Sequence, residues 1–454
     1  MRTHALVAAL TALTLAAPAI AQDSPPVSAD TSTPTATAVP AAAKSMVPAI
    51  TIQHIRPQDK RGLNMFEAPK NDNIPYNGFK LDFGAAFTQQ FQDLEHSNTA
   101  DAVPAPGNNN LMEIGSGFNN AVANLYVNAQ LAPGIRVSMT SYLSSRHHQE
   151  TWVKDGYIQI DESPIDVPAL NTLMDYLTLK VGHFEINYGD AHFRRTDNGN
   201  AMYNPFVGNL IMDAFTTEIG AEAYLRSNGF MVMGGVTGGE VRGMVTRPND
   251  RAMSYIAKAG VDRQLTPDLR VRLMGSMYTT DKSASNTLFA GDRAGSRYYQ
   301  VMENDAATEN GNFRSGMYVP GFGSKVRAFQ VNPFVKFHGL EAFGVIETAK
   351  GRNATETADR DVTQYAGDVV YRFLADDKLF VGARYNTVTG RLAGAAFTDD
   401  VTTTRQQYSA GWFVNDLLML KAEYVTQKYE DFPAVDIRNG GKFKGFMLEG
   451  VVAF

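Results

Sequence analysis

The stretch KFKGFMLEGVVAF, from Lys442 to Phe454, decides the fold of this chain. In an extended strand, successive side chains point to opposite faces. One face then holds Phe446, Leu448, Gly450, Val452 and Phe454, and the other holds Gly445, Met447, Glu449, Val451 and Ala453. The first face suits lipid and the second tolerates water. A half-buried strand of a soluble sheet alternates in the same way. The rest of the sequence is therefore needed to distinguish a membrane strand from a soluble one.

The first 21 residues have the features of a secretory signal peptide. Arg2 precedes an apolar run from Ala5 to Ala17, and Ala19-Ile20-Ala21 form a small-x-small cleavage pattern before Gln22. The run is too short to anchor the chain across a bilayer. We therefore expect export and cleavage after residue 21. The chain has no cysteine, which excludes a lipid-anchored lipoprotein and agrees with passage through an oxidising compartment.

The composition favours a strand-rich membrane protein over a helical one. Hydrophobic residues make up 44% of the chain, but after the signal no apolar run is long enough for a membrane helix. The 39 Gly, 26 Phe and 19 Tyr, against two Trp, fit strands with aromatic girdles at the membrane boundaries. A net charge of -6 argues against a nucleic acid as a partner.

Residues 22–76 differ in composition from the remainder of the chain. Up to about Ile50 they are rich in Pro, Ala, Ser and Thr and have little to bury, which predicts an extended periplasmic leader. The residues from Thr51 to Tyr76 contain apolar side chains at no clean period. They either pack against the following domain or lie in its mouth.

From residue 77 onward the chain alternates between apolar and polar residues, as in Phe79, Leu81 and Phe83 against Lys80 and Asp82. Short turns are expected at residues 132–134, 227–229, 265–268, 338–339, 375–378 and 415–416. Longer polar connections lie between them, at about residues 93–117, 146–151, 187–216, 239–251, 279–323, 349–361, 389–401 and 426–441. Transmembrane barrels sort their loops in this way, with short periplasmic turns and long extracellular loops, whereas a soluble sandwich has no reason to do so.

We therefore predict that residues 77–454 form an all-β, transmembrane antiparallel β-barrel of about 16 strands. One enlarged short-side turn is expected near residues 162–175, where it holds a helical turn. Pro333 lies inside the strand predicted over residues 329–337 and cannot donate to a neighbouring strand, which indicates a bulge or a strand end there.

A barrel of this size is not filled by its own wall residues, so the inward side chains are candidates for function. Strand parity places thirteen basic and nine acidic residues inside. The basic set is Lys80, Arg136, Arg146, Lys180, Arg226, Lys258, Arg270, Arg272, Lys336, Arg372, Arg384, Arg405 and Lys421. The acidic set is Asp82, Asp155, Asp161, Glu218, Glu222, Asp262, Asp368, Glu423 and Glu449. A basic excess favours anions in a pore; alternatively, these charges pair across adjacent strands and hold the wall together.

The connection over residues 187–216 has a mixed composition. It contains His192, Arg194, Arg195 and Asp197 and, further on, apolar residues from Phe206 to Met212. A solvated outer loop has little use for these apolar residues. We therefore expect the connection to fold into the lumen and its four charged or titratable residues to form a constriction that selects by size and charge.

Two stretches of this region resemble a known family. LKVGHFEINYGDAHFRR, from Leu179, and PFVGNLIMD, from Pro205, are similar to the corresponding region of the phosphate-selective group of Gram-negative outer-membrane porins. The runs GLEAFGVIETAKGR from Gly339 and FVGARYNTVTGRL from Phe380 also resemble porin-like sequences. The resemblance implies a sixteen-stranded barrel, commonly trimeric, with arginines leading to the constriction. Arg194, Arg195, Arg270, Arg272, Arg384 and Arg405 are the candidates for that ladder.

The sequence thus predicts an outer-membrane porin of a Gram-negative bacterium, a water-filled pore for small hydrophilic solutes, with a preference for anions. Its expected partners are outer-membrane lipids, the barrel-assembly machinery through the C-terminal strand, and copies of itself in a homotrimer. An enzyme is not expected, because no G-x-S-x-G elbow is present, and neither a metal nor a cofactor is implied. The alternative is a loop-plugged structural or adhesive barrel that exposes the aromatic residues of the connection over residues 279–323.

Overall fold

The computed structural model describes residues 47–454, apart from residues 104–108, 148–150, 240–244 and 247. The predicted signal peptide and the first part of the leader lie outside the described residues. The strands are β1 (Lys80–Ser97), β2 (Gly117–Phe118), β3 (Val122–Ala132), β4 (Ile135–Ser144), β5 (Trp152–Ile160), β6 (Leu177–Glu185), β7 (Thr217–Ser227), β8 (Phe230–Thr237), β9 (Ser254–Gln264), β10 (Leu269–Thr280), β11 (Lys325–Phe337), β12 (Leu340–Arg352), β13 (Arg360–Phe373), β14 (Leu379–Gly390), β15 (Val401–Asn415), β16 (Leu418–Glu430) and β17 (Lys442–Ala453).

Helical structure is sparse. The described residues contain one short α-helix, α2 (Pro168–Met174), and 3-10 turns at Lys60–Gly62, Ser145–His147, Ala191–Phe193, Pro248–Asp250 and Ala375–Asp377. None of the helices in the described part of the chain has the length and apolar character needed to cross a membrane.

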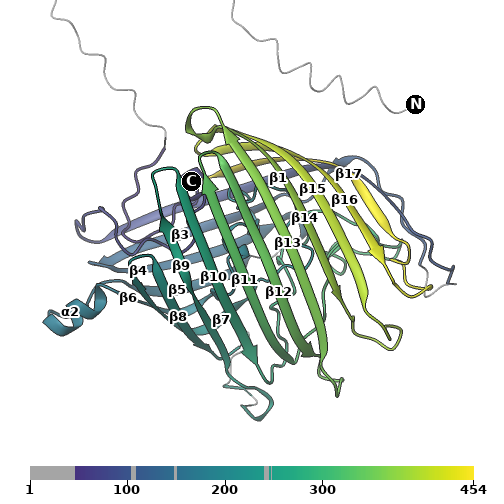
Figure 1. The fold of residues 1–454 in the computed structure, drawn as a ribbon, viewed down its shortest axis with the longest axis horizontal. Helices are drawn as coiled ribbons and strands as arrows, with labels where there is room; N and C mark the ends of the chain where they lie inside the picture. The colour runs from purple at the N-terminus through teal and green to yellow at the C-terminus, as the bar shows by residue number, and fades with distance from the viewer. Residues whose placement is uncertain (1–46, 104–108, 148–150, 240–244, 247) are drawn as a thin grey trace, which may run out of the picture. The chain divides into compact units, whose positions relative to one another are not determined.

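The strands form one closed barrel (Figure 1). Apart from the two-residue β2, which pairs with β1 at its edge, each strand pairs antiparallel with its neighbours in sequence. The barrel closes between β1 and β17, in register from Ala86 opposite Ala453 to Ser97 opposite Lys442. The prediction of an all-β antiparallel barrel of about 16 strands is confirmed.

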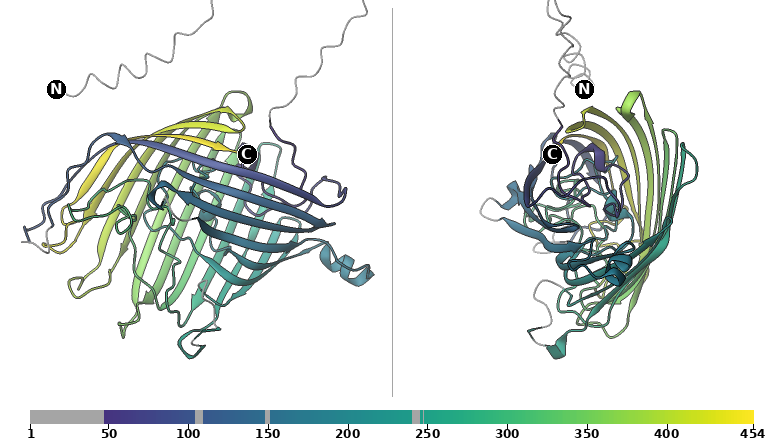
Figure 2. Two further views of the ribbon diagram at one scale, coloured as in Figure 1. Left: turned by 180° about the vertical axis from the view of Figure 1, so that it is seen from behind. Right: turned by 90° about the vertical axis from the view of Figure 1, so that its left-hand side faces the viewer.

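The two ends of the barrel differ. All six predicted short turns join neighbouring strands at one end, which we call the short-turn end, and the enlarged turn between β5 and β6 holds α2 there. The connections at the opposite end, the long-loop end, are longer, and the largest spans residues 281–324 between β10 and β11. Figure 2 shows that much of the chain outside the strands lies within the outline of the barrel.

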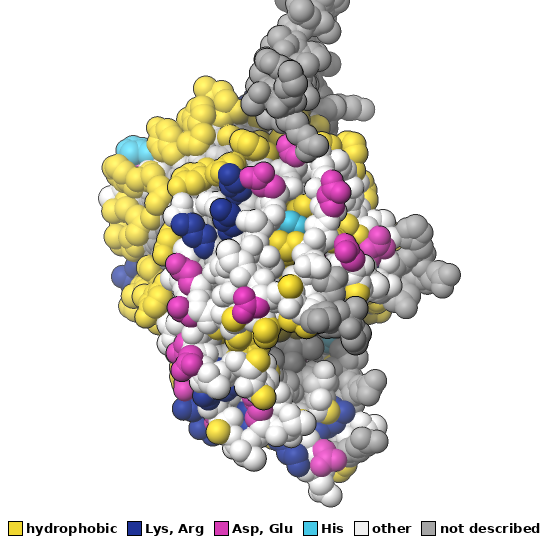
Figure 3. Space-filling view, turned by 90° about the vertical axis from the view of Figure 1, so that its right-hand side faces the viewer, with side chains coloured by type: hydrophobic (Ala, Val, Ile, Leu, Met, Phe, Trp, Pro, Cys, Tyr) yellow, Lys and Arg dark blue, Asp and Glu magenta, His cyan; other side chains and the backbone are white. Residues whose placement is uncertain are grey.

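The barrel is apolar outside and polar inside. In β8, Phe230, Val232 and Val236 are exposed on the outer face, while Met231 and Met233 are buried in the interior. Charged residues of other strands, such as Lys258 and Glu341, are buried on the inner side. Figure 3 shows one side of this surface, where a broad hydrophobic area borders a region of mixed charged and polar side chains. Exposed aromatic residues outside and buried charges inside are the pattern of a wall that faces lipid.

Pro333 does not end β11, contrary to the expected bulge or strand end. It pairs with Leu273 of β10 in an unbroken register. Toward β12 the ladder is interrupted at residues 332 and 333, and it resumes in the same register. Gly344 of β12 leaves space for the ring, because a Cβ at that position would come within 2.9 Å of Pro333 Cγ. Asn332 Nδ2 donates to the Gly344 carbonyl at 3.1 Å and replaces part of the lost pairing.

Candidate functional site

Residues 186–216, which we call the lumen segment, leave β6, cross the barrel interior and return to β7. Phe206, Val207, Ile211 and Met212 are completely buried. On an external loop these apolar side chains would face water, so their burial inside the barrel favours a path through the lumen. The backbone is held by polar side chains on the far wall, since the Val207 N–H donates to Glu423 at 2.8 Å. Ile211 and Met212 donate in the same way to Asn386 (2.7 Å) and Gln364 (3.1 Å).

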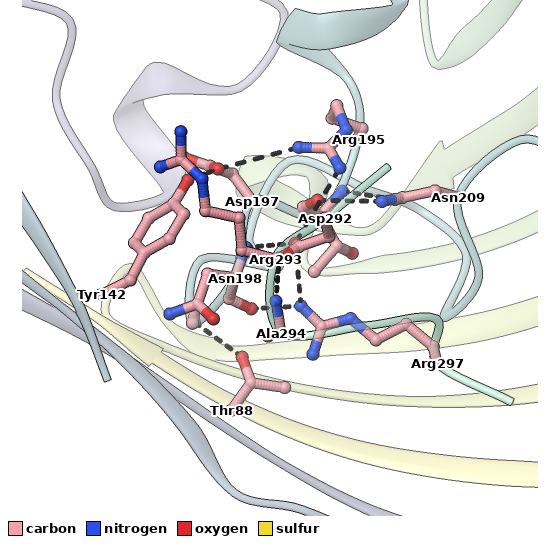
Figure 4. A network of polar contacts seen from close by, with 12 residues as sticks. Thr88, Tyr142, Arg195, Asp197, Asn198, Asn209, Asp292, Arg293, Ala294 and Arg297 are labelled. Atoms are coloured by element: carbon pink, nitrogen blue, oxygen red, sulfur yellow. Dashed lines mark hydrogen bonds and ion pairs between the residues drawn. The ribbon is translucent and has the colours of Figure 1, made fainter. Parts of the chain in front are cut away.

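The β10–β11 loop, residues 281–324, also enters the barrel. Its Tyr298, Tyr318 and Phe322 are buried, while Tyr299 and Phe313 are half-buried, so most of the aromatic residues on which the adhesive alternative rested point into the protein. The loop packs on the lumen segment, as the Tyr318 N–H donates to the Ile211 carbonyl at 2.9 Å. Asp292 accepts the Asn198 N–H at 2.6 Å, at the centre of a network that joins the two segments (Figure 4).

The N-terminal segment, residues 47–79, makes one circuit of the short-turn end inside the barrel. Its successive contacts are Gln53 with Gln130 of β3, Lys60 with Asp416 of the β15–β16 turn, Asn64 with Glu341 of β12, Glu67 with Arg272 of β10, Ala68 with Arg226 of β7, and Lys70 with Leu177 of β6. The segment thus lines the inner wall of the barrel at this end.

A cluster of four buried charges ties these parts together. Lys258 lies 2.7 Å from Asp190 and 3.3 Å from Glu67, and Arg272 contacts the same two carboxylates at 2.8 and 2.9 Å. Burial alone would raise the pKa of Glu67, but the charges of Arg272 and Lys258 outweigh it and hold this pKa well below its usual value. The pKa of Asp190 is lowered by the same pair against the effect of burial. The N-terminal segment is therefore docked through the ionised carboxylate of Glu67.

Between these segments and the wall formed by β3 to β7 lies a cavity of about 210 Å³. Six cationic side chains line it, Arg56, Arg136, Lys154, Lys180, Arg195 and Arg226, together with four carboxylates, Glu67, Asp155, Glu185 and Asp197. Larger clefts of about 530 and 680 Å³ adjoin the N-terminal segment at the short-turn end.

Three of the four residues predicted for a constriction line this cavity: His192, Arg195 and Asp197. Arg195 pairs with Asp213 at 2.6 Å, and Asp197 pairs with Lys154 at 2.6 Å and contacts the Tyr142 hydroxyl. Burial lowers the pKa of His192, which leaves the ring neutral at pH 7 although Glu185 lies 3.3 Å away.

Arg194 points away from the cavity. Its guanidinium donates to Asn64 and lies 3.3 Å from Glu341, over the rings of Phe334 and Phe343. The four residues therefore do not form one ring, and their role in selection stays a prediction.

Among the thirteen basic residues predicted to point inward, Arg136, Lys180 and Arg226 line the cavity. Several others pair with wall carboxylates, namely Arg270 with Asp262 (2.7 Å), Arg372 with Glu341 (2.8 Å), Arg384 with Asp368 (2.6 Å) and Lys421 with Glu449 (2.7 Å). Arg272 belongs to the four-charge cluster, and Arg405 donates to Gln427 and to the carbonyls of Asn209 and Gly316. Arg270 also donates to the Asn64 carbonyl (2.9 Å), Arg384 to the Gly208 carbonyl (3.1 Å) and Lys421 to the Phe206 carbonyl (2.7 Å), so most of these side chains hold an inner segment to the wall.

The predicted acidic residues divide in the same way. Glu218 accepts a hydrogen bond from Tyr278, Glu222 from the Asn187 N–H, and Glu423 from Tyr298. Asp82 lies near the start of β1 and is partly exposed.

Sequence reasoning missed Arg56, Glu67 and Lys154. Arg56 and Glu67 belong to a segment without the alternation of a strand, so the sequence pattern could not show which side chains of that segment point into the barrel. Lys154 was missed because the β4–β5 register shifts between Thr140 and Ser141, which places both Lys154 and Asp155 at the cavity. Among the described residues, no group of His, Asp or Glu is arranged to hold a metal ion.

The closed barrel, its apolar outer face and its inward-folded segments define a porin-like β-barrel of sixteen strands. No family model matches the chain, and no curated protein does. Solved structures are similar in fold. OmpT of Vibrio cholerae, as a loop L8 deletion mutant, is 12% identical with a TM-score of 0.48, over 83% of this chain and 100% of that one.

Two further structures are similar to the same degree. The anion-selective porin from Comamonas acidovorans is 9% identical with a TM-score of 0.48, over 83% of this chain and 100% of that one. OmpF of Salmonella typhi, in complex with daunomycin, is 13% identical with a TM-score of 0.46, over 84% and 99%. Likeness at this level concerns the fold alone and says nothing about a solute.

Proposed function

We propose that the protein is an outer-membrane porin with a narrow, charged passage that admits small hydrophilic solutes by passive diffusion and prefers anions. The observation that carries this proposal is the cavity beside β3 to β7, with its six cationic and four anionic side chains. On this proposal the short-turn end faces the periplasm and the long-loop end faces the exterior.

The anion preference is supported by how the cavity charges are paired. Lys258 and Arg272 compensate Glu67, and Lys154 compensates Asp197. Arg56 and Arg136, in contrast, donate to neutral oxygens, among them the Phe193 and His54 carbonyls. Arg226 does the same with the Ala68 carbonyl. Among the described residues Arg56, Arg136 and Arg226 therefore form no ion pair, although Asp155 and Glu185 line the same cavity, where Lys154 also contacts Glu185 at 2.8 Å. An anion in the cavity meets three cationic groups that have no carboxylate in direct contact. Phosphate as a particular solute remains a prediction of the sequence resemblance.

A plugged barrel is the second candidate, and the packing at the long-loop end favours it. The lumen segment and the β10–β11 loop pack into that half, where two cavities measure about 20 and 10 Å³. Passage then requires movement of side chains such as Arg293, which donates to Thr217 and lies over the Phe215 ring.

Conductance of the purified protein in planar bilayers separates the two candidates. The porin proposal predicts small stepwise conductances and a reversal potential on the anion-selective side across a salt gradient. The absence of steps at every voltage, in protein shown to be folded by its heat-modifiable migration, would favour the plugged barrel.

We also propose that copies of the chain assemble into a homotrimer through the outer face of β3 to β7. The outward positions of β3, β4, β6 and β7 carry no Phe, Tyr or Trp in these described strands, whereas β1, β11, β13 and β17 present several. A surface without an aromatic girdle is suited to another protein rather than to the lipid boundary. The C-terminal strand is the proposed contact for the assembly machinery, and Phe454→Ala is expected to lower the amount of inserted protein on immunoblots of outer membranes.

A further inference from the structure

Three lysines gather on the outer face of the barrel near the long-loop end. Lys428 of β16 lies directly opposite Lys442 of β17, and Lys444 lies opposite Thr426. All three lysines are exposed, and they alternate with the buried residues Gln427 and Phe443, so they point outward.

Like charges directly opposite on one face of a sheet repel each other. The barrel has a second such pair, Arg327 of β11 opposite Lys350 of β12. There each cation has its own carboxylate, Asp281 at 3.0 Å and Asp361 at 3.4 Å. At the lysine cluster only Lys444 is matched in this way, by Glu95 at 3.0 Å. In the described part of the chain no ion pair is formed by Lys428 or Lys442, so this pair lacks a counter-ion from the protein.

The position of the cluster points to the source of that counter-ion. Next along the same outer face, toward the middle of the barrel, the rings of Tyr424 and Phe446 lie 5.0 Å apart. Aromatic rings at such a level mark the boundary of the hydrocarbon, which places the lysines among the lipid headgroups.

Hydroxyl groups extend the polar surface beside the lysines. Thr404 of β15 is opposite Lys428, and it approaches Thr387 at 3.1 Å. Thr389 and Thr402 form a similar pair at 3.0 Å. Ammonium and hydroxyl donors together suit a phosphate carried on a sugar.

We propose that Lys428, Lys442 and Lys444 bind a phosphate group of the glycolipid in the outer leaflet. The inference rests on the proposed outer-membrane location, because only there does the long-loop end meet that leaflet. It is independent of whether the barrel conducts.

The test compares three proteins purified from outer membranes: the wild type, K428Q/K442Q, and the matched control R327Q/K350Q. Each is incubated in detergent with diphosphorylated lipid A or with its dephosphorylated form, and bound lipid is measured by native mass spectrometry. We expect K428Q/K442Q to retain roughly tenfold less diphosphorylated lipid A than the wild type, since each lysine near a charged membrane surface contributes appreciably to binding. The control should retain as much as the wild type, and the dephosphorylated lipid should bind to none of them.

Equal retention by all three proteins, or equal loss in the control, would overturn the site. Displacement of lipid A by millimolar inorganic phosphate alone would also overturn it, because the lysines would then recognise the free ion. Bilayer conductance of the same samples keeps the two proposals apart. If the wild type conducts but retains no lipid A, the lysine site is rejected and the porin proposal stands. If the wild type retains lipid A but does not conduct, the porin proposal is rejected and the lysine site stands.

Discussion

Arg56, Arg136 and Arg226 are the residues on which anion preference depends, because their hydrogen bonds reach neutral oxygens at a charged cavity. Arg56 and Arg226 are only partly buried, so glutamine can replace them with little strain. A unit charge about 7 Å from a permeating ion contributes at least about 0.6 kcal/mol, a factor of roughly three in relative permeability. We expect R56Q/R226Q to reduce the anion-to-cation permeability ratio by at least about ninefold, measured from the reversal potential.

The control for this change is Arg327→Gln, at the exposed rim and paired with Asp281. It should leave the reversal potential unchanged. An equal shift in both variants would place the selective charges at the rim instead of in the cavity.

Glu67 gives the docked N-terminal segment a dependence on pH. Its pKa is lower in the folded protein than in the unfolded chain, so the stabilisation is complete above the unfolded value of about 4.3 and is lost as the pH falls below it. Removing one member of a buried ion pair costs about 3 kcal/mol or more. Glu67→Gln should therefore loosen the segment at neutral pH, detected as lower protection from amide hydrogen exchange over residues 47–76, and should reduce the acid-induced loss of protection that we expect in the wild type. A wild type with exchange unchanged down to pH 3 would contradict this account.

At the scale of the elements, the strands were predictable and the inner segments only partly so. In a strand such as β8, apolar outward residues recur at every second position because one face meets lipid, and this period can be recognised in the sequence. Phe206 to Met212 also indicated burial of the lumen segment. The N-terminal segment has no such signal, because its contacts are scattered over six parts of the wall. Lys154 was not predicted to point inward, because the register shift that turns it inward is not marked by any local residue pattern.

Deleting residues 47–76 tests the N-terminal segment as the inner wall of the passage. The cavity would merge with the clefts at the short-turn end, and we expect a severalfold higher single-channel conductance, because conductance grows with the open cross-section. The matched control replaces α2 (Pro168–Met174), also at the short-turn end, by a short glycine-serine turn. It should conduct like the wild type. If the deletion variant is folded and conducts no better than the wild type, the narrowest point lies in the other inner segments.

At the scale of the whole molecule, the distribution of outer aromatic residues predicts which face is covered. Val181 of β6 lies opposite Ala221 of β7 on the proposed interface, and Val369 of β13 lies opposite Ala342 of β12 on the lipid face. Both pairs are exposed in the single chain. Tryptophan at both positions of the first pair should convert the trimer to monomers in detergent, measured by light scattering, whereas the second pair should tolerate tryptophan. If both variants remained trimeric, the proposed interface would be wrong and the subunits would have to contact each other through another face.

The circuit of the N-terminal segment also determines an order of events during folding. Its backbone contact between Lys60 and Asp416, and the Asn64 contact with Glu341, join residues that are hundreds of positions apart. Forming such contacts costs the entropy of closing a very long loop, and this cost falls once the partner residues are already fixed in space. The partners come from strands that span nearly the whole wall, so they are fixed only when the ring has closed. The earliest-synthesised part of the described chain is therefore the last to reach its place, and biogenesis ends when this segment lines the mouth from within.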